Sequence, residues 1–140
     1  MKKFTIFLFI VMCGVGCISK EDGVSEIHDI ESAMLKAQNA CGQTSMPWLY
    51  DLLQKGEEDR LSMAHNGSYI GFVSLVTYQN KSVFYTNFMN LVGGGRMFHL
   101  MDCQGNQFDA SVAADPAFFQ KEAHKKENII YSSAPLEFFD

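Results

Sequence analysis

The chain has 140 residues, of which 47% are hydrophobic and 12 are phenylalanines. This composition supports one folded domain with a packed core and excludes a disordered chain. Acidic residues outnumber basic ones by 16 to 11, the net charge is −5, and basic residues form no long run. We therefore expect no nucleic-acid partner and no electrostatic attraction to anionic lipids.

The first 17 residues have the pattern of a lipoprotein signal. Lys2 and Lys3 precede an apolar run, 4–12, which is too short to span a bilayer and fits the apolar region of a secretory signal. The stretch Gly14-Val15-Gly16-Cys17 resembles a bacterial lipobox. The resemblance implies that residues 1–16 are removed and that Cys17 carries a diacylglycerol and fatty acyl groups such as palmitate. The alternative is an ordinary cleaved signal in which Cys17 stays unmodified.

A short polar segment, residues 17–25, follows as a lipidated tether. Its Lys20-Glu21-Asp22 resembles the signal that exports lipoproteins to the cell surface in Bacteroidetes-type bacteria. A plain solvated linker is the alternative. We expect the remaining residues, 26–140, to form a single domain anchored by lipid to a bacterial outer membrane, with possible exposure at the cell surface.

Two helices are predicted at the start of this domain. Apolar residues at helical spacing indicate the first, which Ser25 caps and Gly42 ends: Ile27, Ile30, Met34, Ala37 and Cys41. A second helix begins after Ser45 with Pro47 in its first turn and Gly56 as a candidate end, and the polar residues 57–66 are either a loop or a frayed extension of this helix. Its apolar stripe comprises Trp48, Leu49, Leu52 and Leu53.

The pattern then changes to that of strands. Aromatic and β-branched residues predict strands over 69–78 and 82–90, joined by a hairpin at Asn80-Lys81. Further strands are expected over 97–103 and near 107–110, a third helix begins at Asp115 and Pro116, and 128–132 is a candidate last strand. This order predicts an α+β fold, in which an N-terminal helix pair packs on an antiparallel sheet of three to four strands and a C-terminal helix follows.

Two cysteines, Cys41 and Cys103, remain in the domain. An exported protein with two such thiols usually joins them. Cys41 ends the apolar stripe of the first helix, and Cys103 shares a strand face with Met97, His99 and Met101. We predict a disulfide between them that ties the first helix to this face; two free buried cysteines are the alternative.

Three short motifs carry a resemblance to a known group: Met46-Pro47-Trp48-Leu49, Ser82-Val83-Phe84-Tyr85 and Asp102-Cys103-Gln104-Gly105-Asn106. Their order is similar to that in small, uncharacterised Bacteroidetes lipoproteins with a Pro-Trp-Leu helix start and an Asp-Cys-x-Gly-Asn turn. That group implies no activity and no functional residue. The helix-helix-sheet order is also similar to β-lactamase-inhibitor proteins and to small lipoproteins of outer-membrane assembly, as an analogy of fold.

Catalytic and metal sites are not indicated by residue spacing. His99 and Cys103 stand about 13 Å apart along an unbroken strand, too far for a thiol–imidazole pair. His65, His99 and Asp102 lack the spacing of metal ligands, so we expect no metal and no cofactor. Gly93-Gly94-Gly95-Arg96 lacks the following helix of a phosphate loop and fits a flexible hairpin loop better.

The aromatic hairpin is the candidate binding surface. Tyr69, Tyr78, Tyr85 and Arg96 are the residues proposed for this face, because exposed aromatic residues anchor interfaces. We therefore interpret the chain as a non-enzymatic binding or interaction module with a protein or glycan partner. A hydrolase or another enzyme is the rival interpretation, and packing of these rings into the core is the structural alternative.

Overall fold

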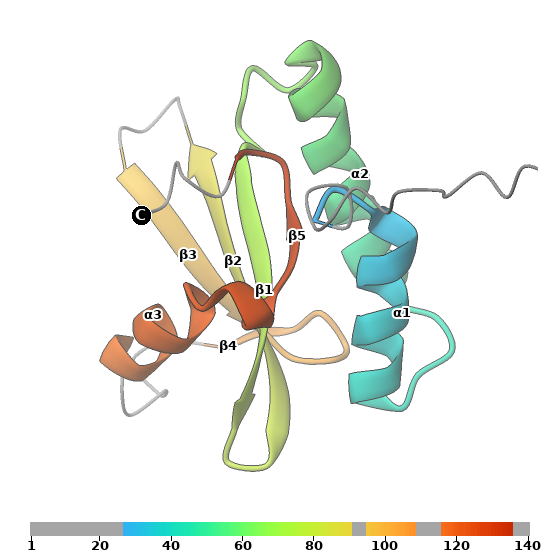
Figure 1. The fold of residues 1–140 in the computed structure, drawn as a ribbon, viewed down its shortest axis with the longest axis vertical. Helices are drawn as coiled ribbons and strands as arrows, with labels where there is room; N and C mark the ends of the chain where they lie inside the picture. Colours follow the sequence, from blue (N-terminus) through green and yellow to red (C-terminus); the bar gives the residue numbers. More distant parts are fainter. Residues whose placement is uncertain (1–26, 91–94, 109–115, 136–140) are drawn as a thin grey trace, which may run out of the picture.

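The computed structural model describes residues 27–90, 95–108 and 116–135, with no side-chain description at 89–90, 95–97 and 108. The elements follow one another as α1 (Ile30–Cys41), α2 (Pro47–Ser62), β1 (Gly71–Tyr78), β2 (Lys81–Asn90), β3 (Gly95–Met101), β4 (Gln107–Phe108), α3 (Pro116–Ala123), a 3-10 turn (Lys126–Asn128) and β5 (Ile129–Ser132). The predicted α+β fold is confirmed, with two N-terminal helices, an antiparallel sheet and a C-terminal helix (Figure 1).

The sheet has the strand order β4-β3-β2-β1-β5, and every neighbouring pair is antiparallel. The short β5 adds a fifth strand beside β1. β1 and β2 form a hairpin in which Tyr78 pairs with Lys81, so the two-residue turn is Gln79-Asn80, one residue before the expected position. Both turn residues have positive φ, 49° and 61°, which suits the twist of a tight hairpin.

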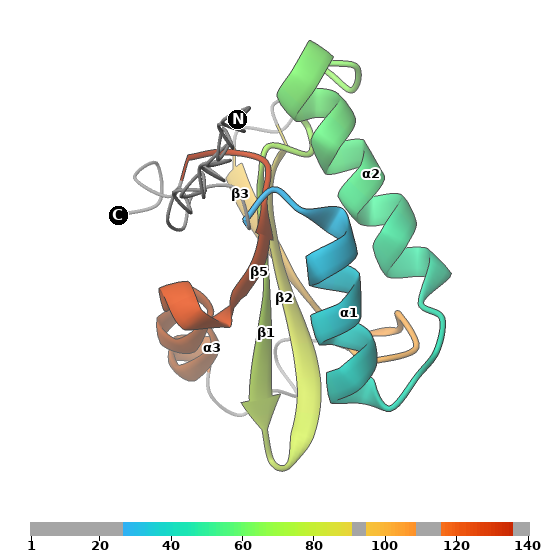
Figure 2. The same cartoon turned by 45° about the vertical axis from the view of Figure 1, so that its right-hand side comes forward.

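Helices cover the two faces of the sheet in separate layers. Figure 2 shows α1 and α2 together on one face and α3 on the other. Successive residues of a strand point to opposite faces. Val73 of β1 accordingly packs in the core under the helix pair, whereas Phe72 and Val76 pack in the core beneath α3.

Each face has its own apolar core. The core under the helix pair contains Ala33, Ala37, Met46, Leu49, Leu53, Val73, Phe84, Ile130 and Tyr131. The core under α3 contains Phe72, Val76, Val83, Tyr85, Leu100, Phe119, Ala123 and Ile129. A shift in the β1–β5 register between Val73 and Ser74 accounts for the neighbours Ile130 and Tyr131 lying on the same side.

The helix boundaries differ from the predicted ones. α1 begins at Ile30, where the Asp29 carboxylate accepts a hydrogen bond from Glu31 N at 3.0 Å; Ser25 lies outside the described residues. α2 passes through Gly56 and ends at Ser62. Gly56 is a packing glycine rather than a stop, because a Cβ there would lie 3.0 Å from the Tyr131 ring.

The predicted disulfide is confirmed. Cys41 and Cys103 are bonded, with their Cα atoms 5.8 Å apart. The bond joins the C-terminal end of α1 to the turn between β3 and β4, which reaches toward that helix end in Figure 1. It therefore links the helix layer to the sheet on the predicted face.

Candidate functional site

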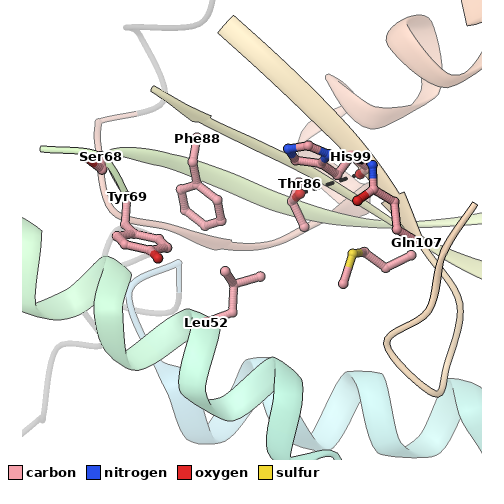
Figure 3. Close-up of a pocket in the computed structure, with 8 residues that line it drawn as sticks. Leu52, Ser68, Tyr69, Thr86, Phe88, His99 and Gln107 are labelled. Carbon is pink, nitrogen blue, oxygen red and sulfur yellow. Dashed lines mark hydrogen bonds between the residues drawn. The ribbon is translucent and has the colours of Figure 1, made fainter. Parts of the chain in front are cut away.

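A pocket of about 400 Å³ lies between α2 and the helix-facing side of β2 and β3 (Figure 3). α1 packs against β5, at the opposite edge of the sheet from β3 and β4, and its C-terminal end is tied to the β3–β4 turn by the disulfide. The described residues that line it are Leu52, Ser68, Tyr69, Thr86, Phe88, His99, Met101 and Gln107. The volume falls within the range of small-molecule sites.

One end of the pocket is aromatic. The rings of Tyr69 and Phe88 meet edge to face with centroids 5.8 Å apart, and Leu52 of α2 lies opposite them (Figure 3). His65 packs edge-on against the Tyr69 ring at 5.2 Å, and Lys55 Nζ lies 5.8 Å from the centroid of the same ring. Tyr69 is thus held by neighbours outside the pocket while it contributes to the pocket wall.

The other end is polar. Gln107 Nε2 donates a hydrogen bond to His99 Nδ1 at 2.9 Å, which bridges β4 and β3. Thr86, only 4% exposed, donates its hydroxyl to the His99 carbonyl at 3.4 Å. His99 Nε2 and Gln107 Oε1 have no hydrogen-bond partner among the described residues and are available to a ligand.

Gln107 depends on the turn between β3 and β4 for its position, since β4 has only two residues. The Asp102 carboxylate accepts hydrogen bonds from Gln104 N at 2.9 Å, from Asn106 N at 2.8 Å and from Asn106 Nδ2 at 3.0 Å. Partial burial by itself would raise the pKa of Asp102, but these hydrogen bonds outweigh it and lower that pKa below its ordinary 3.8.

Trp48 of α2 holds the same turn from the helix side. Its Nε1 donates to the Cys103 carbonyl at 3.3 Å, and its ring lies against Gly105, where an added Cβ would approach the indole to 2.6 Å. Gly105 also has φ +83°, a conformation that favours glycine. The disulfide, the indole and the Asp102 hydrogen bonds together fix the turn that precedes Gln107.

Asp59 fixes the aromatic end. It is completely buried near the end of α2, and its carboxylate accepts hydrogen bonds from His65 N at 2.5 Å and from Tyr69 N at 2.8 Å. A buried carboxylate requires such donors to replace water. Asp59 therefore closes the connection between α2 and β1 and places Tyr69 beside the pocket.

The polar groups of the described lining are hydroxyls, one amide and one imidazole. Among the described lining residues there is no carboxylate, thiol, lysine or arginine. Ser68 and His99 lie at opposite ends of the pocket with Phe88 between them, so they form no nucleophile–base pair (Figure 3). Cys103 is in the disulfide, and the described part of the chain contains no cluster of three potential metal ligands.

The structure separates the residues of the predicted binding face. Tyr69 lines the pocket under the helix pair. Tyr85 is 3% exposed in the core under α3, stacked between Phe72 and Phe98, and Tyr78 packs against Phe119 on that same side. These two tyrosines therefore do not share a surface with Tyr69.

Arg96 and the lipidation site cannot be placed with the pocket. Residues 91–94 of the glycine loop, the Arg96 side chain, and Cys17 with its signal and tether lie outside the described residues. Within the described part, no helix combines the length and hydropathy needed to cross a bilayer.

Sequence reasoning overlooked Thr86, Gln107 and Leu52 as site residues. Strand parity offers a signal for Thr86, because Thr86 and Phe88 alternate with Tyr85 and pair across β2–β3 with His99 and Met97. Comparison with known protein families, with curated proteins and with solved structures finds no match.

Proposed function

We propose that this chain is a non-enzymatic binding domain, anchored by lipid to a bacterial outer membrane, which holds a small neutral ligand in the pocket between α2 and β2–β3. The observation that carries the proposal is the pocket itself: an aromatic end, a polar end and no acid–base pair among its described lining residues. Pockets of mostly apolar lining with a few placed polar groups are typical ligand sites.

The anchor is proposed from the sequence. Lys2, Lys3, the apolar run and the lipobox-like Gly14-Val15-Gly16-Cys17 support lipidation of Cys17, and several acyl chains give stable membrane attachment. The tether Lys20-Glu21-Asp22 supports export to the cell surface, where a protein or glycan partner is accessible. The acidic balance of the chain argues against a nucleic-acid partner.

The ligand site is tested by screening a library of neutral fragments against the purified full chain in phospholipid nanodiscs, with ¹H–¹⁵N spectra as the readout. We expect hits to shift the amides of Thr86, Phe88, His99 and Gln107. Leu52→Trp should fill the pocket and remove these shifts. Leu61→Trp is the matched control, because Leu61 lies on the same helix, is 69% exposed and does not line the pocket.

Two outcomes would overturn the proposal. Hits that bind equally well to the Leu52→Trp variant would place the ligand site elsewhere. Conversion of a pocket-binding hit into a product by the wild-type chain, and not by Leu52→Trp, would identify the domain as an enzyme.

The anchor has a separate test. Cys17→Ala should abolish labelling by an alkyne fatty acid and release the chain from the membrane fraction. Unchanged labelling in this variant would rule out lipidation at Cys17 and leave the pocket proposal unaffected.

A further inference from the structure

We infer that the ligand of this pocket is a neutral saccharide unit, whose ring packs against Tyr69 and Phe88 while its hydroxyl groups bond to His99 and Gln107. This inference rests on the proposed function and names the chemical class of the ligand. It follows from which polar groups line the pocket and from the charge that the lining lacks.

Charged ligands are disfavoured by the described lining. No lysine, arginine or acidic side chain belongs to it, and the nearby Lys55 ammonium is paired with Asp51 at 2.6 Å. A phosphate or carboxylate ligand would leave water without gaining a lysine or arginine partner among these residues, which costs free energy. A ligand cation would likewise find no carboxylate among these residues.

A purely apolar ligand fits only half of the pocket. An acyl chain would pack well against Leu52, Phe88 and Met101, but it would cover His99 Nε2 and Gln107 Oε1 without bonding to them. Buried polar groups that lose water and gain no partner weaken binding.

A saccharide satisfies both ends at once. The C–H groups of one face of a sugar ring pack against the negatively polarised faces of aromatic rings, which Tyr69 and Phe88 supply. Its hydroxyl groups both donate and accept, so they can bond to both groups that the polar end offers, His99 Nε2 and Gln107 Oε1. The Tyr69 and Ser68 hydroxyls, which have no hydrogen-bond partner among the described residues, add two groups that can do either.

The inference is tested with the purified full chain in nanodiscs, titrated separately with methyl β-glucoside, methyl β-galactoside, N-acetylglucosamine and cellobiose as saccharide probes and with 1-hexanol as the apolar probe. We expect at least one saccharide to shift the Tyr69, Thr86, His99 and Gln107 amides in a saturable way. Gln107→Ala should raise the Kd of that saccharide by about tenfold, because one hydrogen bond to the ligand is lost and His99 is released.

Matched controls separate the site from the rest of the surface. Gln104→Ala removes an exposed amide from the same turn, outside the pocket lining, and should leave the Kd unchanged. Tyr69→Ala should abolish the saccharide shifts, whereas Tyr50→Ala, in the separate groove between α1 and the start of α2, should not.

The failures of the two proposals are distinguishable. If 1-hexanol shifts the pocket amides and none of the saccharides does, the saccharide class is wrong and the binding pocket stands. If saccharides bind with equal Kd to wild type and Gln107→Ala, the assigned contacts are wrong. If neither kind of probe, nor any fragment of the neutral library, shifts these amides, the proposed binding function itself fails.

Discussion

The two faces of the sheet are made by the same strands but are stabilised in different ways. Under α3 the core is dense in rings, with Tyr85 stacked between Phe72 and Phe98, and Phe119 packed against Tyr78. α3 itself has only eight residues, Pro116–Ala123. Apolar burial between side chains dominates this face, and the buried Ser74 hydroxyl of β1 adds one directed bond by donating to the Ala123 carbonyl of α3 at 2.6 Å.

The face under α1 and α2 adds specific links to its apolar core. The Cys41–Cys103 disulfide and the Trp48 indole over Gly105 join the helices to the β3–β4 turn. The buried Asp59 carboxylate joins α2 to the connection that leads into β1. The pocket lies between these links, with the Asp59 loop at its aromatic end and the β3–β4 turn at its polar end.

The contrast between the two faces indicates how a small domain can keep a pocket open. On a face filled with side chains the packing itself stabilises the fold, since removing a buried side chain leaves a cavity that costs free energy. A face that leaves room for a ligand loses that packing energy and depends on directed bonds to hold the walls apart. Breaking a link should therefore disturb the pocket, and breaking the α3 core should cost stability without disturbing it.

Reduction of the disulfide is expected to have the largest effect. The bond spans 62 residues of sequence, so the chain-entropy estimate for its loss is about 4 kcal/mol of unfolding free energy. Reduction of the wild-type chain should lower the urea midpoint, and Cys41→Ser should reproduce the change without reductant. Loss of the disulfide should also weaken the Gln107–His99 hydrogen bond, and the ¹⁵N shifts of the His99 ring measure this change. An unfolding free energy that is the same with and without reductant would contradict this account.

Phe119→Ala tests the other face. Phe119 is fully buried, and removing such a ring costs about 3–4 kcal/mol. The ¹⁵N shifts of the His99 ring should stay as in wild type, because Phe119 contacts the face away from the pocket. Phe118→Ala, at the half-buried neighbour, should cost about 1–2 kcal/mol. If Phe119→Ala moved the His99 ring shifts as far as reduction does, the two faces would not be separable.

Residue patterns predicted the disulfide and the β3–β4 turn, but they did not predict the pocket. The disulfide was predicted from the two thiols left in an exported domain and from the positions of Cys41 and Cys103 in their elements, with two free cysteines as the alternative, and the structure confirms the bond. The Asp102–Asn106 turn is local, because its hydrogen bonds form within five residues. This turn is set by neighbours along the chain, which a sequence displays directly, whereas the disulfide joins residues that are 62 positions apart.

The pocket could not be predicted in the same way. The tyrosines were grouped by residue type, but Tyr69 and Tyr85 point to opposite sides, and a one-residue change of phase reverses the face of a strand residue. The end of α2 was misplaced at Gly56 because the reason for that glycine is Tyr131, 75 positions later. Contacts between segments far apart in the sequence determine both features, and the local spacing of residues does not indicate those contacts.

Asp59→Ala tests the link at the aromatic end and should cost about 2–3 kcal/mol, because two backbone N–H groups lose a charged acceptor in a buried site. The amide of Tyr69 should lose protection from hydrogen exchange. Asp51→Ala is the matched control: Asp51 is exposed on the same helix, its pair with Lys55 is at the surface, and its loss should cost at most about 0.5 kcal/mol. Equal losses in the two variants would show that the buried hydrogen bonds of Asp59 contribute nothing special.

The smallest expected effect is the pH dependence of the β3–β4 turn. The pKa of Asp102 lies below its ordinary 3.8 in the folded chain, because the hydrogen bonds from Asn106 and Gln104 to the carboxylate outweigh its partial burial. The ionised form is therefore favoured by folding, and its contribution is fully present above pH 3.8 and is lost as the pH falls through the lower folded-state pKa. Asp102→Asn keeps the shape without the charge and should cost about 1 kcal/mol at pH 7, because hydrogen bonds to a charged acceptor are the stronger ones. The difference in unfolding free energy between wild type and Asp102→Asn should stay constant from pH 7 to pH 5 and then shrink toward pH 3. A difference that stays constant down to pH 3, or that grows, would mean that the carboxylate is not the group that holds this turn.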